Sequence, residues 1–316
     1  MKNNLSNLAI TLALGLILSG CSSSESDSSA SGGIKVVAAM YPLEFVAKAI
    51  GGDMVSVENF TPPGVEPHDL ELTPSQVVEL DAADLLLYIS GFQPALEEAA
   101  QQSAPANSLD LLSVDGLNLL TATEDGHNDG AEDVNEGEEA HSDEEMVNDP
   151  HFWLDPARLI VVAKAVASKL SEVNPENSEA FESNLAAFVT ELEALDAKFT
   201  TGLATCERDL IVTSHAAFGY LADAYGLSQE AIAGLSPESE PTPKRLNEIG
   251  KEAKADGTTT IFFETLASPK VAQTLANDLN IESAVLDPIE GISEGQTYFS
   301  VMESNLEALR KALSCK

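Results

Sequence analysis

The sequence of 316 residues predicts an α/β protein with two lobes, each built on a parallel sheet, and one long helix between them. Short apolar runs alternate with helical patterns in both halves of the chain, which is typical of strand–helix–strand units. Between the halves, residues 174–205 carry apolar residues at helical spacing for about eight turns, more than an average globular helix. Such a helix suits a rigid connection between two lobes.

The strands of the first half are short apolar runs, which suit a parallel sheet covered on both faces. The helix that begins after Thr73 has this residue as its N-cap and Pro74 at its first position. Strands are expected at 34–40, 55–60 and 84–90, and helices at 41–52, from Pro74 onward and at 94–103.

The second half repeats the alternation after a helix that opens at Asp155 and Pro156. Gly226 is expected to end one of its helices, because glycine adopts the left-handed conformation at a helix C-terminus. Strands are expected at 209–214, 231–235, 258–264 and 281–286, and helices at 157–173, 216–225, 242–257, 268–279 and 298–313.

The N-terminus reads as a secretory signal, with Lys2 ahead of the apolar run 8–18, which is too short to span a membrane. The ending LSGC resembles the lipobox of bacterial lipoproteins, in which Cys21 becomes the lipidated first residue. An ordinary secreted protein cleaved nearby is the alternative. The serine-rich stretch that follows suits a flexible tether to an anchor. We therefore expect an extracytoplasmic protein anchored to the cell membrane.

These observations predict an order of segments along the chain. The expected segments are a signal peptide at 1–20, a tether at 21–33, an N-terminal lobe at 34–172, a linking helix at 173–205 and a C-terminal lobe at 206–316.

The formal net charge of −36 disfavours nucleic acid and other anionic partners and attracts cations. Residues 121–150 hold twelve acidic residues and no lysine or arginine, which predicts a mobile acidic loop within the N-terminal lobe. His127 and His141 lie among these acids. The loop is either a solvated run of charge or a low-affinity collector of cations.

Export places the folded part in an oxidising compartment. Cys206 and Cys315 are far apart in the sequence, so they do not form a CxxC-type metal site. We expect a disulfide that joins the C-terminal helix to the start of the second lobe. Two free buried thiols are the alternative.

Three of the five histidines occupy equivalent places. His68 follows a strand of the first lobe, His151 precedes a helix that leaves this lobe, and His215 lies where a strand of the second lobe turns into a helix. Loops beyond the carboxyl ends of parallel strands form the ligand crevice of open α/β sheets. Two carboxylates, Glu264 and Asp287, follow strands in the same way.

Three histidines and one carboxylate can close a four-coordinate shell around a divalent transition metal. A shell without an open position holds a metal and does not catalyse hydrolysis. Neutral imidazoles and a carboxylate suit Zn²⁺ and Co²⁺, and Mn²⁺ less tightly, whereas the lack of thiolates disfavours copper(I) and iron–sulfur sites.

Five motifs, in order, carry a resemblance to a known family: GVEPHDLELTPSQV, DPHFWLDP, IVTSHAAFGYLADAYGL, IFFETLASPKVAQTLA and VLDPIEG. The chain from about residue 34 onward resembles the solute-binding lipoproteins of zinc and manganese ABC importers. This resemblance implies two Rossmann-like lobes, a rigid backbone helix, one metal between the lobes and delivery of the metal to a membrane permease.

Position by position, the resemblance implies that His68, His151 and His215 are metal ligands. Asp287 matches the fourth ligand of relatives that use an aspartate, and Glu264 is the alternative, with hydrogen bonding near the cleft as its other role. Histidine rather than glutamate at position 215 favours zinc over manganese.

The expected function is therefore extracytoplasmic capture of Zn²⁺ by a monomer that delivers it to an ABC permease. A manganese or iron carrier of the same family is one alternative, and a surface adhesin is another. A zinc hydrolase would need an open coordination position, and the chain contains no HExxH motif. We expect no enzyme activity.

Overall fold

The computed structural model describes residues 33–103, 107–123 and 146–316. The signal peptide, Cys21, nearly all of the tether, His127 and His141 lie outside these residues. Residues Gly33–Lys316 form one compact unit that holds both expected sheets, and the lobe boundaries at residues 172 and 206 stay a prediction.

The first sheet has the strand order β2-β1-β3-β4, and all of its strands are parallel. Ile34 pairs with Val55 and Val36 pairs with Leu85. Strands β1 and β3 are the most buried, because their near-continuous apolar residues meet helices on both faces. The strands are β1 (Ile34–Ala38), β2 (Val55–Asn59), β3 (Leu85–Tyr88) and β4 (Ser108–Asp110). The sequence analysis predicted the first three and missed the three-residue β4.

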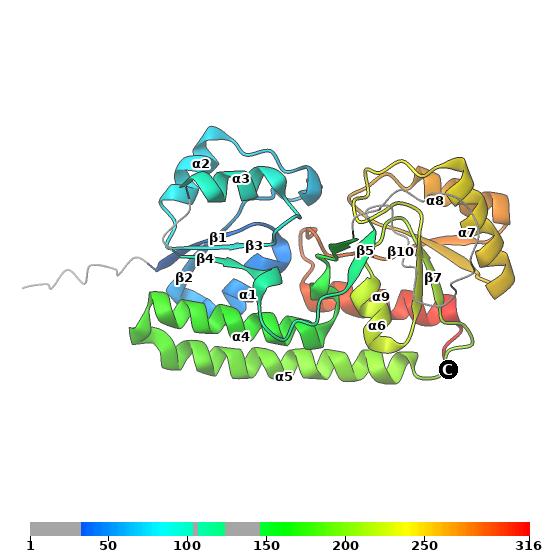
Figure 1. Cartoon of the computed structure of the whole chain (residues 1–316). Helices are drawn as coiled ribbons and strands as arrows, with labels where there is room; N and C mark the ends of the chain where they lie inside the picture. Colours follow the sequence, from blue (N-terminus) through cyan, green and yellow to red (C-terminus); the bar gives the residue numbers. More distant parts are fainter. Residues whose placement is uncertain (1–32, 104–106, 124–145) are drawn as a thin grey trace, which may run out of the picture. The chain divides into compact units, whose positions relative to one another are not determined.

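Helices flank this sheet (Figure 1). Thr73 caps its helix as expected, in a capping box with Gln76, and Pro74 takes the first helical position. The helices are α1 (Tyr41–Gly51), α2 (Pro74–Asp81) and α3 (Pro94–Ser103).

The second sheet is also parallel, in the order β10-β9-β7-β8. Strand β8 covers Ser228–Ala231, three residues earlier than expected, because its pairing with β7 starts at Ser228 and Leu210. The other strands are β7 (Leu210–Thr213), β9 (Thr260–Phe263) and β10 (Glu282–Val285), and the helices are α6 (Gly219–Tyr225), α7 (Pro243–Asp256), α8 (Lys270–Leu279) and α9 (Tyr298–Leu313).

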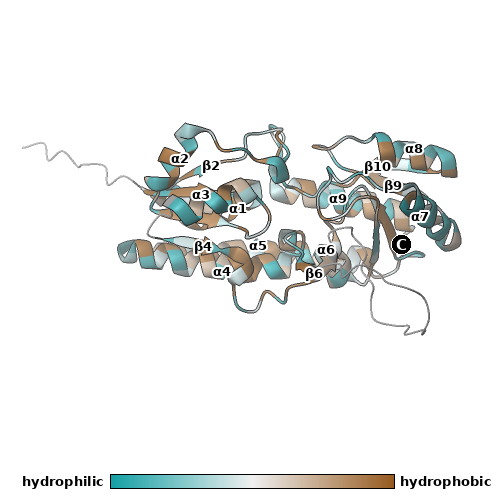
Figure 2. Ribbon diagram, turned by 45° about the horizontal axis from the view of Figure 1, so that its top comes forward, coloured by the Kyte–Doolittle hydropathy of each residue, from teal (hydrophilic) through white to brown (hydrophobic). Residues whose placement is uncertain are grey.

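Two long helices, α4 (Pro156–Val173) and α5 (Ser178–Leu203), connect the sheets. Helix α5 is about 39 Å long and contacts α1 and α4 as well as α6 and α9 (Figure 1). It begins later than expected because Pro175, which lacks a backbone N–H, opens a separate 3₁₀ turn at Pro175–Asn177. Hydrophobic and hydrophilic residues alternate along both helices, as expected where one face is buried (Figure 2).

Strands β5 (Thr121–Thr123) and β6 (Met146–Asn148) form an antiparallel pair at the two ends of the acidic segment. The sequence analysis expected a loop throughout 121–150. Along the part of the chain that the structure describes, no helix has the length and apolar character needed to cross a membrane.

The expected disulfide between Cys206 and Cys315 is confirmed. Cys206 follows α5 and Cys315 follows α9, so the bond joins the ends of these two helices across 109 positions of sequence. The alternative of two free thiols is therefore wrong.

Candidate metal centre

His68 lies in a short 3₁₀ turn, Pro67–Asp69, after strand β2. Both carboxylate oxygens of Glu66 accept the backbone N–H of His68 at 3.2 Å, which caps this turn. From the other side, the buried amide of Gln93 donates to the carbonyl oxygen of Pro67 at 3.0 Å. The ring centroids of Phe92 and His68 lie 4.2 Å apart. These contacts fix the turn and the ring that it carries.

His151 follows strand β6 and begins the 3₁₀ turn Phe152–Leu154. Oδ1 of Asp149 lies 2.8 Å from Nδ1 of His151 and also accepts its backbone N–H at 2.9 Å. When Nδ1 carries the proton that Asp149 accepts, Nε2 has a free lone pair. The indole of Trp153 packs beside this imidazole, with the ring centroids 5.2 Å apart.

His215 comes directly after strand β7 and its neighbour Ser214. Oε1 of Glu264 lies 2.9 Å from Nδ1 of His215 and accepts the hydroxyl of Ser214 at 2.7 Å. The carbonyl oxygen of His215 accepts the hydroxyl of Thr213 at 2.8 Å. Glu264 therefore orients His215 as Asp149 orients His151.

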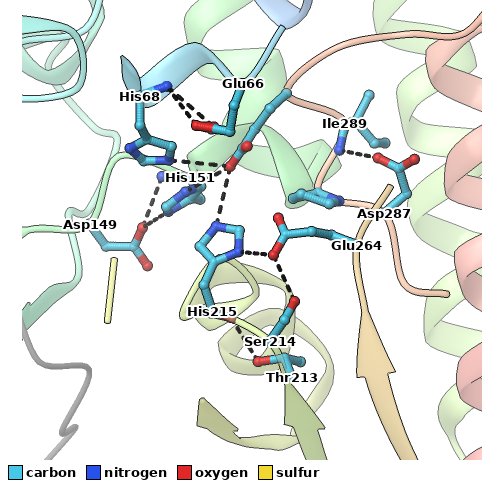
Figure 3. Close-up of polar contacts among 12 residues, drawn as sticks. Glu66, His68, Asp149, His151, Thr213, Ser214, His215, Glu264, Asp287 and Ile289 are labelled. Atoms are coloured by element: carbon cyan, nitrogen blue, oxygen red, sulfur yellow. Dashed lines mark hydrogen bonds and ion pairs between the residues drawn. The ribbon is translucent and has the colours of Figure 1, made fainter. Parts of the chain in front are cut away.

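The three imidazoles point toward one place from three different segments (Figure 3). Their Nε2 atoms lie near Oε1 of Glu290, at 3.5 Å from His68, 3.2 Å from His151 and 3.3 Å from His215. The four ligand atoms all lie within 4.8 Å of one another. The residues therefore form a compact set of three nitrogens and one oxygen.

These ligand atoms are buried and lack hydrogen bonds. The Nε2 atoms of all three histidines and both carboxylate oxygens of Glu290 have no hydrogen-bond partner. Leaving buried polar atoms unpaired costs about 1–3 kcal/mol each, and more for a charged group. A divalent cation coordinated by all four residues would satisfy them together, with imidazole nitrogens at about 2.0–2.1 Å from zinc.

The electrostatics of the set also suit a cation. Burial lowers the pKa of His215, but Glu264 and Glu290 overcome this effect and raise it well above its usual value. Burial likewise lowers the pKa of His151, and the nearby carboxylates of Asp149 and Glu290 raise it overall. These shifts show that the surrounding carboxylates stabilise positive charge inside the site.

The pKa values of Glu290 and His68 are shifted by the same surroundings. Burial raises the pKa of Glu290, but the three histidines hold it well below its usual range. Burial is the main cause that lowers the pKa of His68. Glu66 differs, because burial and the neighbouring Glu290 raise its pKa to about 8.

One side of the centre opens to solvent. His151, His215 and Glu290 are buried, whereas the side chain of His68 is 10 % exposed. His68 lines a cavity of about 690 Å³ together with Phe92, Asn148, Pro150 and Ser236. An ion would reach the buried ligands past His68.

The structure brings the three predicted histidines together but differs at the fourth position. Asp287 lies outside the ligand group, because its carboxylate accepts the backbone N–H of Ile289 at 2.8 Å and the hydroxyl of Thr265 at 2.9 Å. Among the described residues, the histidines are grouped with Glu290 and not with the expected Asp287, which lies three residues earlier. Glu264 has the alternative role expected for it, hydrogen bonding near the cleft, through its contacts with Ser214 and His215.

The sequence analysis missed Glu290 because it considered only carboxylates that follow an expected strand and chose Asp287 from the resemblance to relatives that use an aspartate. Asp287 comes soon after β10, and Glu290 comes after a turn whose shape the sequence pattern does not specify. The only signal for Glu290 was a second carboxylate in the same VLDPIEG stretch.

The chain matches a family of known proteins over most of its length. Residues 36–312 match the family model described as zinc-uptake complex component A, periplasmic. The chain is 36% identical to the zinc-binding protein AdcA of Streptococcus pyogenes serotype M3 over 89% of its own length. It spans 56% of that relative.

A second relative is matched over nearly its full length. The high-affinity zinc uptake system protein ZnuA of Bacillus subtilis is 34% identical, with 98% of each chain covered. Among solved structures, the laminin-binding protein Lmb of Streptococcus agalactiae, described as having adhesin and metal transporting activity, aligns with a TM-score of 0.76. This alignment has 28% identity and covers 89% of the present chain and 100% of Lmb. The chain belongs to the family of zinc-uptake complex component A.

Proposed function

We propose that this protein captures Zn²⁺ outside the cytoplasm and delivers it to the permease of an ABC importer. One observation carries the proposal: four buried ligand atoms, from His68, His151, His215 and Glu290, converge without hydrogen-bond partners. The names of the zinc-binding and zinc-uptake relatives support the same cargo.

The donor set favours zinc over manganese. Three imidazole nitrogens and one carboxylate oxygen match the tetrahedral preference of Zn²⁺, whereas Mn²⁺ prefers more oxygen ligands in an octahedral arrangement. Four protein ligands also leave no open position for an activated water. The geometry therefore supports a binding protein and not a hydrolase.

Delivery requires that the protein stay near its permease. The LSGC sequence ending at Cys21 supports a lipid anchor, and the serine-rich tether after it would allow the folded part to move between capture and docking. We propose that the protein acts as a monomer outside the cytoplasm, anchored to the cell membrane.

The test is a competition titration of the metal-free protein with Zn²⁺ and then Mn²⁺ against a chelator of known affinity. Trp153, the single tryptophan, lies beside His151 and should report binding by fluorescence. We expect one tightly held zinc per chain that excess manganese does not displace. Tighter manganese binding would identify a manganese carrier and contradict the proposal.

Three histidine substitutions make this test more specific. His215→Ala should lower zinc affinity by several orders of magnitude, because it removes a ligand and leaves the other ligands buried. His127→Ala and His141→Ala remove histidines of the acidic segment and serve as matched controls, with the tight site intact. Loss of the tight site in these controls alone would place zinc binding in the acidic segment.

An adhesin is a second candidate, supported by the similarity to Lmb. Binding to immobilised laminin, compared with and without zinc, tests this function directly. Binding that persists in His215→Ala would separate adhesion from metal capture, and lack of binding would exclude this candidate.

A further inference from the structure

The residue immediately before Glu290 has an unusual backbone. Ile289 is fully buried and has φ of +59°, in the left-handed region. Such a conformation is rare for β-branched residues, because their Cβ crowds the backbone. Among the described residues, the other non-glycine residues with positive φ are asparagine or serine, which tolerate this region better. The backbone is strained directly beside a proposed zinc ligand.

Strain of this kind persists only where the surroundings over-determine the conformation. Oδ1 of Asp287 accepts the N–H of Ile289 at 2.8 Å, which closes the turn from within. Oδ2 of Asp287 accepts the hydroxyl of Thr265, from the loop after β9, at 2.9 Å. Both oxygens of Asp287 therefore hold the turn, and neither faces the histidines (Figure 3).

Helix α9 supplies a second contact through Asn305, a buried polar residue inside the helix. Its Oδ1 accepts the N–H of Asp287 at 2.9 Å, and its Nδ2 donates to the carbonyl oxygen of Asp287 at 2.7 Å. Asn305 thus forms hydrogen bonds with both the N–H and the carbonyl group of Asp287. This bidentate contact fixes where the turn starts.

The third contact comes from the segment that carries His151. Nε1 of Trp153 donates to the carbonyl oxygen of Pro288 at 2.7 Å, and the hydroxyl of Tyr298 donates to the carbonyl oxygen of Trp153 at 2.6 Å. The indole thus lies between the imidazole of His151 and the turn that carries Glu290. Two of the four ligands are linked through one buried side chain.

We infer that Asp287 and Asn305 are positioning residues that hold the strained turn Asp287–Glu290 and thereby present Glu290 as the fourth ligand. This inference rests on the proposed zinc capture. Two carboxylates lie three residues apart in this turn, and its conformation directs only one of them into the centre.

Asp287 could be a positioning residue or a zinc ligand, and these two roles predict different effects of one conservative substitution. In Asp287→Asn, the side-chain oxygen can still accept the N–H of Ile289, and the new amide can donate to Thr265. A positioning residue tolerates this change, whereas a charged zinc ligand does not. Asp287→Ala removes both contacts and frees the turn.

The experiment measures zinc affinity by chelator competition and the visible absorption of the Co²⁺-loaded protein, using the full chain. Tetrahedral Co²⁺ reports the coordination geometry, which a structural role remote from the ligands would not change. We expect Asp287→Asn to bind zinc within about threefold of the parent protein. We expect Asp287→Ala and Asn305→Asp to lose about 10–100-fold in affinity and to weaken the tetrahedral Co²⁺ bands.

Two further variants calibrate these results. Glu290→Gln should lose more affinity than Asp287→Ala, because it replaces the charged carboxylate ligand by a weaker, neutral amide. Ser304→Ala is the matched control on α9, since its hydroxyl donates only to the carbonyl oxygen of Ser300 in the same helix. Circular dichroism and thermal unfolding would establish that each variant is folded. If Asp287→Ala does not fold, the zinc affinity of Asn305→Asp tests the inference.

The inference is overturned if Asp287→Asn loses as much affinity as Glu290→Gln, because Asp287 would then be a ligand. It is also overturned if the folded Asp287→Ala and Asn305→Asp variants bind zinc and Co²⁺ like the parent. A parent protein without a tight zinc site would contradict the proposed function itself, together with this inference.

Discussion

Oε1 of Glu264 lies 2.9 Å from Nδ1 of His215, and both side chains are buried. The contact turns Nε2 of the imidazole toward Glu290, so Glu264 acts on the metal centre through the histidine. Carboxylates in this position raise the basicity of a histidine ligand and fix its tautomer.

The first prediction concerns Glu264. Glu264→Ala should lower zinc affinity by about 10–100-fold, because His215 would lose the acceptor that orients its ring. Chelator competition measures the change. Glu282→Ala is the matched control, since Glu282 is an exposed carboxylate paired with Lys311. Equal affinities in the two variants would show that the contact does not tune the ligand.

A second prediction uses the space beside Asp149. A Cβ added at Gly219 would lie 2.8 Å from Oδ2 of Asp149, closer than side chains tolerate. Gly219→Ala should therefore displace Asp149 from Nδ1 of His151 and lower zinc affinity by about tenfold or more. Gly250→Ala is the control, because its Cβ would meet Leu279 at an ordinary 3.6 Å. Zinc titration of a folded Gly219→Ala protein with unchanged affinity would count against the role of Asp149.

The third prediction concerns pH. The pKa values of His151 and His215 are raised in the metal-free fold, despite the opposing effect of burial, by hydrogen bonds and charge from nearby carboxylates. A raised folded-state pKa stabilises the metal-free fold below the unfolded value near 6.5, and this stabilisation is lost as pH rises through the raised pKa.

Zinc binding has the opposite dependence, because it requires neutral imidazoles. The increase in melting temperature caused by zinc should therefore be large at pH 8 and should shrink steadily toward pH 5. Thermal unfolding with and without zinc over this range measures the effect, and binding should release protons in buffers of different ionisation enthalpy. A zinc-induced shift that is constant with pH would contradict the assignment of buried histidine ligands.

The fourth prediction concerns the disulfide between Cys206 and Cys315. Replacing both cysteines by serine should lower the free energy of unfolding by about 2–5 kcal/mol, because the unfolded chain regains the freedom of a long closed loop. Denaturant unfolding measures the loss. Reductant should destabilise the parent protein by a similar amount and leave the double variant unchanged, and equal effects on both proteins would contradict the role of this bond.

The elements of the fold were largely predictable because they depend on local patterns. Apolar runs and helix caps placed β1, β3, α2 and α9 close to their observed positions. The errors arose where pairing or a single residue decided the boundary. Strand β8 begins at Ser228 because of its register with β7, and α5 begins at Ser178 because Pro175 starts a separate turn.

The α/β class, the cysteine pair and the three histidines could be predicted from the sequence, since loops that follow strands form the ligand sites of open α/β sheets. The tertiary structure, and no sequence pattern, places Glu290 rather than Asp287 beside these histidines. The turn between the two carboxylates has a left-handed backbone at Ile289 and is contacted by Asn305 and Trp153, which are distant in the sequence. A local sequence pattern does not predict a strained turn, because the contacts that offset the strain of its backbone form only when the chain is folded.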